Sequence, residues 1–257
     1  MRFIDTHCHI IPGVDDGPAD AEVSLDMGRI AAKDGIGTII ATPHVVEGIY
    51  EGADRADKLA GLRDMFAENG VDVELAAGAE VPMSICAGNN GELLGSLTLA
   101  GGRYLLMETS ESTFEQLSQA VFNLRMHGLF PILAHPERAG FVQQHPERLA
   151  ELIGRGDVFV QATVAGIEGM FGKRARKAWL GMVSSGMVHL VGSDAHSRRT
   201  RVPRLSGSYE ELCRLAGEHA ARMIMYENPQ RVLTGEKLAT VVPGRMRHGL
   251  WSRLRGR

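Results

Sequence analysis

Residues 2–9 read Arg-Phe-Ile-Asp-Thr-His-Cys-His, so the first apolar run of the chain ends at two histidines. Six further short apolar runs follow, at 38–41, 73–77, 104–107, 131–134, 158–160 and 188–192. Five of the six are followed within three residues by a histidine or an acid, and the run 158–160 ends at Gln161. The carboxyl ends of the strands converge on one mouth in a closed β/α barrel. The recurrence therefore predicts an α/β barrel with a metal site at its rim.

Segments with helical periodicity fill the gaps between the runs, so the order reads strand-helix seven times. The segments 19–34, 54–69, 113–127 and 175–185 each stop before a glycine, the residue type that ends helices in the left-handed conformation. The returns to the next strand are short, as in consecutive right-handed β-α-β units. The runs are apolar throughout, as expected for strands buried on both faces.

The length of 257 residues, with 44% hydrophobic residues, supplies material for one large core. We therefore expect a single barrel domain over residues 1–242. No apolar stretch approaches the ~18 residues of a membrane span, and the three cysteines are scattered, which favours a cytoplasmic, reducing location.

Residues 243–257 form a separate basic tail. The tail contains five arginines and no acid, so the preceding 242 residues carry a net charge of −8 out of the total of −3. Two interpretations stay open: a solvated, flexible terminus, or a short amphipathic segment that contacts anionic lipid or an acidic partner.

His7 and His9 occupy alternate positions at a strand end, so both imidazoles point to one face and Cys8 to the other. Asp5 precedes them as a candidate orienting residue. Asp15 and Asp16 lie in a turn-rich loop, and their residue types alone predict a turn and a helix N-cap. Glu108 ends a buried strand and needs a cation, either a metal or a basic side chain.

The motifs 7–9 (HCH), 12–18 (PGVDDGP), 42–44 (TPH), 78–80 (GAE), 135–138 (HPER), 193–196 (SDAH) and 227–229 (ENP), in this order, resemble those of the polymerase and histidinol phosphatase (PHP) superfamily. More narrowly, they resemble the bacterial protein-tyrosine phosphatases encoded with capsular and exopolysaccharide genes. The resemblance covers residues 1–236. It implies a distorted seven-stranded (β/α)7 barrel that holds three metal ions at its mouth.

The resemblance also implies the ligands of the three ions, and it reassigns Asp16 from an N-cap to a ligand. The ligands fall into three groups, the first two sharing Glu80: His7, His9, Glu80 and Asp194; Glu80, Glu108 and His135; and Asp16, His44 and His196. Imidazole and carboxylate donors without thiolate suit manganese, iron or zinc, and we expect manganese as the most suitable of the three.

The resemblance further implies that Arg138 and Arg201 clamp the phosphoryl group through their planar guanidinium forks. The expected mechanism is direct attack by a metal-bound hydroxide. The expected substrate is the phosphotyrosine tail of an autokinase that regulates polysaccharide synthesis and export. One departure concerns 161–164, which read Gln-Ala-Thr-Val where relatives tend to have a more polar strand end.

Four other functions are alternatives to this one. A cysteine-based phosphatase requires an arginine six residues after the nucleophile, and Val14, Glu92 and His219 stand at that offset. A nuclease-like enzyme is disfavoured because the body of the chain is acidic, so no nucleic acid partner is expected. Histidinol-phosphate phosphatase activity and a non-catalytic kinase-binding role stay open, as does the oligomeric state.

The cluster Lys173-Arg174-Ala175-Arg176-Lys177 opens a helix and is usually a solvated face. The functional alternative is that it anchors an acidic phosphotyrosine tail. Membrane association through a partner or through the basic tail is a further expectation.

Overall fold

The computed structural model describes residues 2–45, 52–88, 90–109 and 113–243. The basic tail beyond Pro243 lies outside the described residues, so its two interpretations stay predictions. The described chain forms eight strands: β1 (Phe3–Cys8), β2 (Ile36–Ala41), β3 (Glu74–Ala77), β4 (Glu80–Pro82), β5 (Tyr104–Glu108), β6 (Phe130–Ala134), β7 (Phe159–Thr163) and β8 (Leu190–Gly192).

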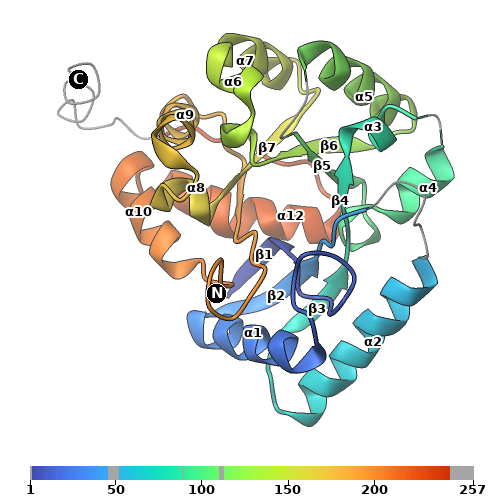
Figure 1. Cartoon of the computed structure of the whole chain (residues 1–257). Coiled ribbons are helices and arrows are strands. Elements are labelled where there is room, and N and C mark those ends of the chain that lie inside the picture. Colours follow the sequence, from blue (N-terminus) through green and yellow to red (C-terminus); the bar gives the residue numbers. More distant parts are fainter. Residues whose placement is uncertain (1, 46–51, 89, 110–112, 244–257) are drawn as a thin grey trace.

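Helices surround the strands on the outside (Figure 1). The α-helices are α1 (Ala21–Asp34), α2 (Gly52–Glu68), α3 (Met83–Cys86), α4 (Gly91–Ser96), α5 (Phe114–Met126), α6 (Gly140–Gln144), α7 (Pro146–Gly154), α8 (Val164–Glu168), α9 (Gly172–Ser184), α10 (Ser206–Ala216), α11 (Glu218–Arg222) and α12 (Asn228–Thr234). Two 3₁₀ turns, η1 (Leu99–Gly101) and η2 (Pro136–Arg138), and one π-helical turn, η3 (Met223–Glu227), complete the set. The predicted helix ends are confirmed: α1 ends at Gly35, which has φ 89° and whose N–H donates to Ala31 O and Ala32 O.

All strand pairs within the two sheets are parallel, which confirms the predicted α/β class. One sheet has the order β1-β2-β3 and the other β4-β5-β6-β7-β8. Two isolated parallel bridges, Cys8 with Ala195 and His44 with Glu80, join the sheets at both edges. The strands therefore surround a common interior, and the bridges lie among the predicted ligands.

The number of strands differs from the sequence prediction. Each of the seven apolar runs coincides with a strand, and the eighth strand, β4, begins at Glu80, which the prediction placed after a strand. Gly78 and Ala79 separate β3 from β4. A Cβ atom at Gly78 would lie 2.9 Å from Ile40 and 3.0 Å from Leu99, so only glycine lets the chain pass this close. The break moves the chain from pairing with β2 to pairing with β5.

Successive side chains of a strand point to opposite faces of the sheet, so the apolar residues form two clusters. The smaller cluster lies between strands and includes Ile40, Leu106, Ile132 and Leu190. Their neighbours in sequence pack outward against the helices, in the larger cluster. Cys8 belongs to the outer cluster, so the prediction that it points away from His7 and His9 is confirmed.

The C-terminal helix closes one end of the interior. Val232 of α12 and Leu238 beyond it pack into the inner cluster, and α12 crosses the middle of the strands in Figure 1. Asn228 is fully buried and hydrogen-bonds to two backbone segments. Its side-chain amide donates to His189 O, next to β8, and accepts from Ala239 N, beyond α12. This role explains the Glu-Asn-Pro motif at 227–229. Within the described ranges, no helix combines the length and apolar character required to span a bilayer.

Candidate metal centre

The structure brings all nine predicted ligands together at the carboxyl ends of the strands. Four groups of imidazole and carboxylate atoms, each with its members within 4.8 Å of one another, account for the whole set: His9, Asp16, His44 and His196; His7, His9 and Asp194; His7, Glu80 and His135; and His44, Glu80 and Glu108. The groups share members, so the nine side chains form one continuous cluster. We call it the rim cluster.

Glu80 lies at the middle of the rim cluster. Its Oε1 is 2.7 Å from His135 Nε2, and its Oε2 is 3.1 Å from His7 Nε2 and 3.3 Å from both His9 Nε2 and His44 Nδ1. The carboxylate is fully buried. Burial alone would raise the pKa of Glu80, but the positive fields of His7 and His135 hold it well below its usual value. The carboxylate therefore stays ionised and presents both oxygens to different neighbours.

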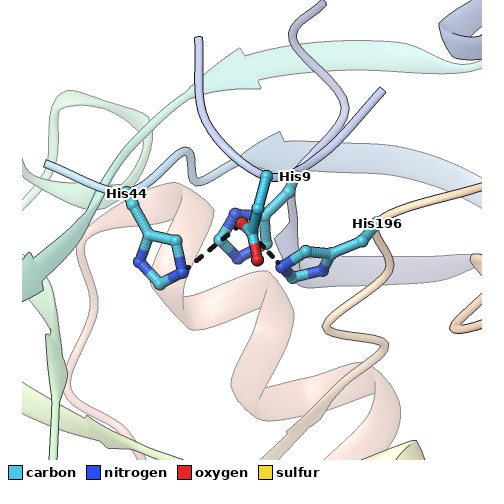
Figure 2. A group of neighbouring side chains, drawn as sticks. His9, His44 and His196 are labelled. Atoms are coloured by element: carbon cyan, nitrogen blue, oxygen red, sulfur yellow. Dashed lines mark ion pairs between the residues drawn. The ribbon is translucent and has the colours of Figure 1, made fainter. Parts of the chain in front are cut away.

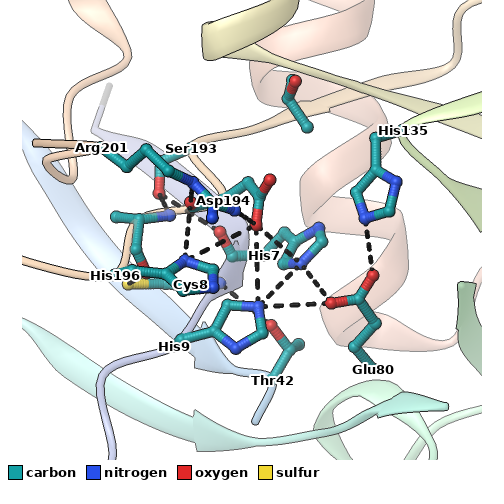
Figure 3. Close-up of polar contacts among 12 residues, drawn as sticks. His7, Cys8, His9, Thr42, Glu80, His135, Ser193, Asp194, His196 and Arg201 are labelled. Atoms are coloured by element: carbon teal, nitrogen blue, oxygen red, sulfur yellow. Dashed lines mark hydrogen bonds and ion pairs between the residues drawn. The ribbon is translucent and has the colours of Figure 1, made fainter. Parts of the chain in front are cut away.

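Asp194 completes the buried part of the rim cluster (Figure 3). Its Oδ1 is 3.4 Å from His7 Nε2 and 3.7 Å from His9 Nε2. Its Oδ2 is buried and has no hydrogen-bond partner among the described residues. Buried carboxylate oxygens are normally paired with a donor or a cation.

The outer part of the rim cluster opens toward solvent. Asp16 Oδ1 lies 3.2 Å from His196 Nε2 and 3.7 Å from His44 Nε2, and the imidazoles of His9, His44 and His196 converge in Figure 2. The side chain of Asp16 is 64% exposed. The N-cap of α1 is Asp20, whose carboxylate accepts from Val23 N. The N-cap interpretation of Asp16 is therefore wrong, and its ligand interpretation stays a prediction.

The donor set fits divalent transition metals. Imidazole nitrogens and carboxylate oxygens suit manganese, iron and zinc, and no cysteine sulfur is a member of the four groups. A metal ligand must be a neutral imidazole, and burial, followed by the charges of His9 and Arg201, lowers the pKa of His196 to about 4. Burial also lowers the pKa of His9, but Asp15 and Glu80 outweigh it and raise the value to about 9. The pocket thus favours positive charge at its centre.

Three non-glycine residues of the site have left-handed backbone. They are His135 (φ 36°), Asp194 (φ 54°) and Arg201 (φ 49°). Such conformations cost about 1–3 kcal/mol each and cluster at functional sites. Ser193 and Asp5 brace one of them: Asp5 accepts from Ser193 N at 3.0 Å and from Ser193 Oγ at 2.5 Å. Asp5 therefore positions the loop that carries Asp194 and does not contact the ligand imidazoles, unlike the role first considered for it.

Two residues that orient ligand imidazoles, Gln161 and Asp15, were not predicted from the sequence. Gln161 Oε1 lies 2.7 Å from His7 Nδ1, and an amide oxygen can only accept, so Nδ1 carries the proton and Nε2 faces Glu80. Asp15 Oδ2 fixes His9 in the same way, at 2.7 Å from its Nδ1. Asp15 also accepts from His44 N, which ties the loop to the strand end. The available signal was that Gln161 ends the only run without a histidine or an acid.

Both predicted phosphate-binding arginines lie beside the rim cluster. Arg201 Nη2 is 2.5 Å from Asp194 Oδ1, and its Nε donates to Asp194 O. The guanidinium of Arg138 lies 4.6 Å from the centre of the Phe171 ring. Arg138 forms no ion pair with any described residue. Glu137, the neighbour of Arg138 in sequence, accepts hydrogen bonds from Thr163 N and Thr163 Oγ1.

The cysteines lack the environment of a nucleophile. Cys8 and Cys86 are fully buried, and burial raises the pKa of Cys8 well above its usual value, with a further contribution from Asp5. A raised pKa disfavours the reactive thiolate.

Comparison with known proteins identifies the relatives of the chain. Residues 3–234 match the family model described as capsular polysaccharide synthesis, CpsB/CapC. The chain is 32% identical to the tyrosine-protein phosphatase YwqE of Bacillus subtilis over 202 residues, covering 77% of this chain and 79% of the relative. It is 29% identical to the tyrosine-protein phosphatase CpsB of Streptococcus pneumoniae over 239 residues, covering 90% and 98%.

Solved structures agree with these relatives. A chain from the crystal structures of YwqE and CpsB, described as unique metal-dependent tyrosine phosphatases, superposes with a TM-score of 0.84 and 28% identity, covering 94% of this chain and 99% of that one. Dihydropyrimidinase from Brevibacillus agri superposes with a TM-score of 0.53 at 13% identity, covering 95% and 73%, which shows a shared fold alone.

The orienting role of Gln161 gives a testable prediction. Gln161→Ala removes the acceptor that fixes His7 and should weaken metal binding by about 10–100-fold, the usual effect of losing such a partner. Gln161→Glu keeps the acceptor and should retain most of the affinity. The measurement is a metal titration against a competing chelator, with the exposed Gln119→Ala on α5 as the matched control. Unchanged affinity in Gln161→Ala would contradict the role.

Proposed function

The chain belongs to the CpsB/CapC family of capsular polysaccharide synthesis proteins, and we therefore propose that it is a metal-dependent tyrosine-protein phosphatase. The observation that carries the proposal is the rim cluster, in which nine imidazole and carboxylate side chains from separate strand ends converge beside two arginines. A structural cluster of this kind would bury several charges at a cost of several kcal/mol each without serving the fold.

Three ions would occupy the rim cluster. We assign the first to His7, His9, Glu80 and Asp194, the second to Glu80, Glu108 and His135, and the third to Asp16, His44 and His196. Manganese is the first candidate, and iron or zinc would satisfy the same donors. When bound, the ions would activate a water for direct attack on phosphorus and neutralise charge that develops on the phosphoryl oxygens.

The side chains of the protein bind and orient the phosphate ester. Arg138 has no carboxylate partner among the described residues, so its guanidinium is available to a phosphoryl oxygen pair. Arg201 lies next to Asp194, with its Nη2 2.5 Å from Asp194 Oδ1. No side chain is required as a nucleophile, since the buried thiol of Cys8 faces the outer apolar cluster.

The wall of the site favours an aromatic ester. The ring of Phe171 lies 4.6 Å from the guanidinium of Arg138, so it offers an aromatic surface beside a proposed phosphate-binding residue. The proposed substrate is a phosphotyrosine on the autokinase that regulates capsular or exopolysaccharide synthesis and export. Support comes from the named relatives, which are tyrosine-protein phosphatases of capsule synthesis.

We also propose that β3 and β4 act as the two halves of one barrel strand, so that a single domain over residues 1–242 forms a distorted seven-stranded barrel. The separation by only Gly78 and Ala79 and the bridge from His44 to Glu80 support this interpretation.

The proposal predicts metal-dependent and thiol-independent hydrolysis. Phosphate release from a phosphotyrosine peptide should disappear after chelation and return on addition of manganese, iron or zinc. Cys8→Ser should keep most of the turnover. Histidinol phosphate serves as the competing substrate. Faster phosphate release from histidinol phosphate than from the peptide would contradict the proposed substrate. Turnover that persists after chelation but is lost in Cys8→Ser would contradict the proposed mechanism.

A second prediction separates phosphate binding from metal binding. Arg138→Ala and Arg201→Ala should each lower kcat/KM. The corresponding loss of transition-state stabilisation should be about 1.5–3 kcal/mol, the range for hydrogen bonds to charged groups. Arg138→Lys should recover part of the loss, because an ammonium keeps the charge without the fork. Arg138→Ala is the cleaner test, since no ion pair among the described residues is broken. Steady-state kinetics, metal content and melting temperature are measured together. A lowered melting temperature with normal turnover would make the arginines structural.

A further inference from the structure

A groove outside the rim cluster runs between α9 and the segment that joins α6 to α7. Its volume is about 760 Å³. Val142, Met182 and Met187 contribute apolar surface, and the charged residues of the lining are two cations, Arg174 and Lys177, and one acid, Glu147, which lies 3.2 Å from His145. In Figure 1, α9 stands beside α6 and α7 on the outer surface of the barrel. We call this feature the α9 groove.

The sequence of α9 produces the hollow. Arg174, Ala178, Gly181 and Ser185 follow one another at helical spacing and line the groove. The opposite face is buried against the barrel, where Trp179 Nε1 donates to Thr163 O at 3.2 Å. Three small side chains therefore leave space along a rigidly anchored helix. A Cβ atom at Gly181 would meet nothing within 4 Å, so the groove is open at this point.

All the charged side chains of α9 are positive. Residues 172–184 contain four cations, Lys173, Arg174, Arg176 and Lys177, and no acid. All four side chains are exposed, and none forms an ion pair with a described residue. On the neighbouring helix α7, by contrast, Arg148 pairs with Glu115 and the following Arg155 pairs with Glu151.

This placement is unfavourable for the isolated fold. Cations in the first turns of a helix oppose its dipole, at about 0.3–1 kcal/mol each, and like charges three or four residues apart repel. The barrel domain as a whole is acidic, because residues 1–242 carry a net charge of −8 even with these four cations included. The fold nevertheless pairs none of the four with a described carboxylate, although Arg176 Nε donates to Ile167 O.

The start of α9 lies close to Arg138, one of the two proposed phosphate-binding arginines. Phe171, the residue that immediately precedes α9, lies under the guanidinium of Arg138 at 4.6 Å. Arg174 is three residues further, about 4.5 Å along the helix axis. A polypeptide that leaves the rim cluster over Phe171 therefore reaches the cations of the groove directly.

We propose that the α9 groove binds an acidic segment of the phosphoprotein substrate that flanks the phosphotyrosine. The inference rests on the proposed phosphatase function and adds the class of sequence that the enzyme prefers. Carboxylates of the segment pair with Arg174 and Lys177, and an apolar side chain between them packs on Val142 and Met182. Extended chain covers about 3.3 Å per residue, so the acids lie roughly three to six residues from the phosphotyrosine.

The test compares two phosphotyrosine peptides of equal length, one with glutamates three to six residues from the phosphotyrosine and one with glutamines there. The wild-type enzyme should show a kcat/KM for the acidic peptide that is roughly three- to tenfold higher, expressed mainly in KM. The double variant Arg174→Glu/Lys177→Glu should lose or reverse this preference. Its turnover of p-nitrophenyl phosphate should be unchanged, because that small ester cannot reach the groove.

Two further variants separate charge from shape. Gly181→Leu fills the open point of the groove and should weaken both peptides without affecting p-nitrophenyl phosphate. The control Arg222→Glu/Lys237→Glu makes the same change of net charge with exposed residues that do not line the groove, and it should keep the preference. The preference should also fall as salt is raised from about 0.05 to 0.5 M, since exposed charges are screened.

Binding is measured separately from turnover, by fluorescence anisotropy with non-hydrolysable phosphonate versions of both peptides. Equal kcat/KM and equal affinity for the two peptides in the wild type would overturn the inference, as would equal losses in the groove variant and the control. If no phosphotyrosine substrate or phenyl ester is hydrolysed, the proposed function fails. The anisotropy comparison then still decides whether the groove selects acidic peptides.

Discussion

The burial of the Glu80 carboxylate among four imidazoles is the interaction on which the mouth of the barrel depends. Ionised carboxylates are costly to bury, and this one is offset by His7, His9, His44 and His135 at 2.7–3.3 Å. Its position follows from the backbone. The close passage of Gly78 past Ile40 and Leu99 starts a new strand at Glu80, and that strand bridges to His44. The same break in the chain therefore joins the two sheets and delivers the central ligand.

The fold separates two environments within one ring of strands. Leu106 and Ile132 fill the interior, Val232 closes it from below, and imidazoles and carboxylates occupy the opposite end. A rigid apolar floor keeps the ligands in place, and Asp15 and Gln161 fix two of the imidazoles by their outer nitrogens. Arg138 lies over Phe171, the residue that precedes the cationic first turns of α9. The molecule thus combines an acidic body with cations that begin close to its metal centre.

Much of this arrangement could be predicted from the sequence. The apolar runs indicate the strands, and the ligand residues that follow them indicate the rim cluster. The seven runs coincide with strands, and the convergence of their ends follows from barrel geometry. What the sequence did not predict depends on three-dimensional neighbours. β4 is too short to give a periodic signal, and its existence depends on the packing at Gly78. Gln161 resembles an ordinary strand end until His7 is placed beside it. Asp15 and Asp16 are adjacent and chemically equal in sequence, and only the loop conformation sends Asp15 inward to His9 and Asp16 to the open edge.

The most direct test of the metal centre is the number of ions that purified protein retains, measured by elemental analysis and located by anomalous diffraction, in wild type, Glu80→Ala and His44→Ala. Glu80 is buried, and its two oxygens lie 2.7–3.3 Å from His7, His9, His44 and His135, whereas the side chain of His44 is 29% exposed. The wild type should retain ions with Glu80 between two of them, and Glu80→Ala should lose more metal than His44→Ala. Equal and near-complete occupancy in both variants would contradict the central position of Glu80, and a wild-type protein without affinity for any of the three metals would contradict the metal centre itself.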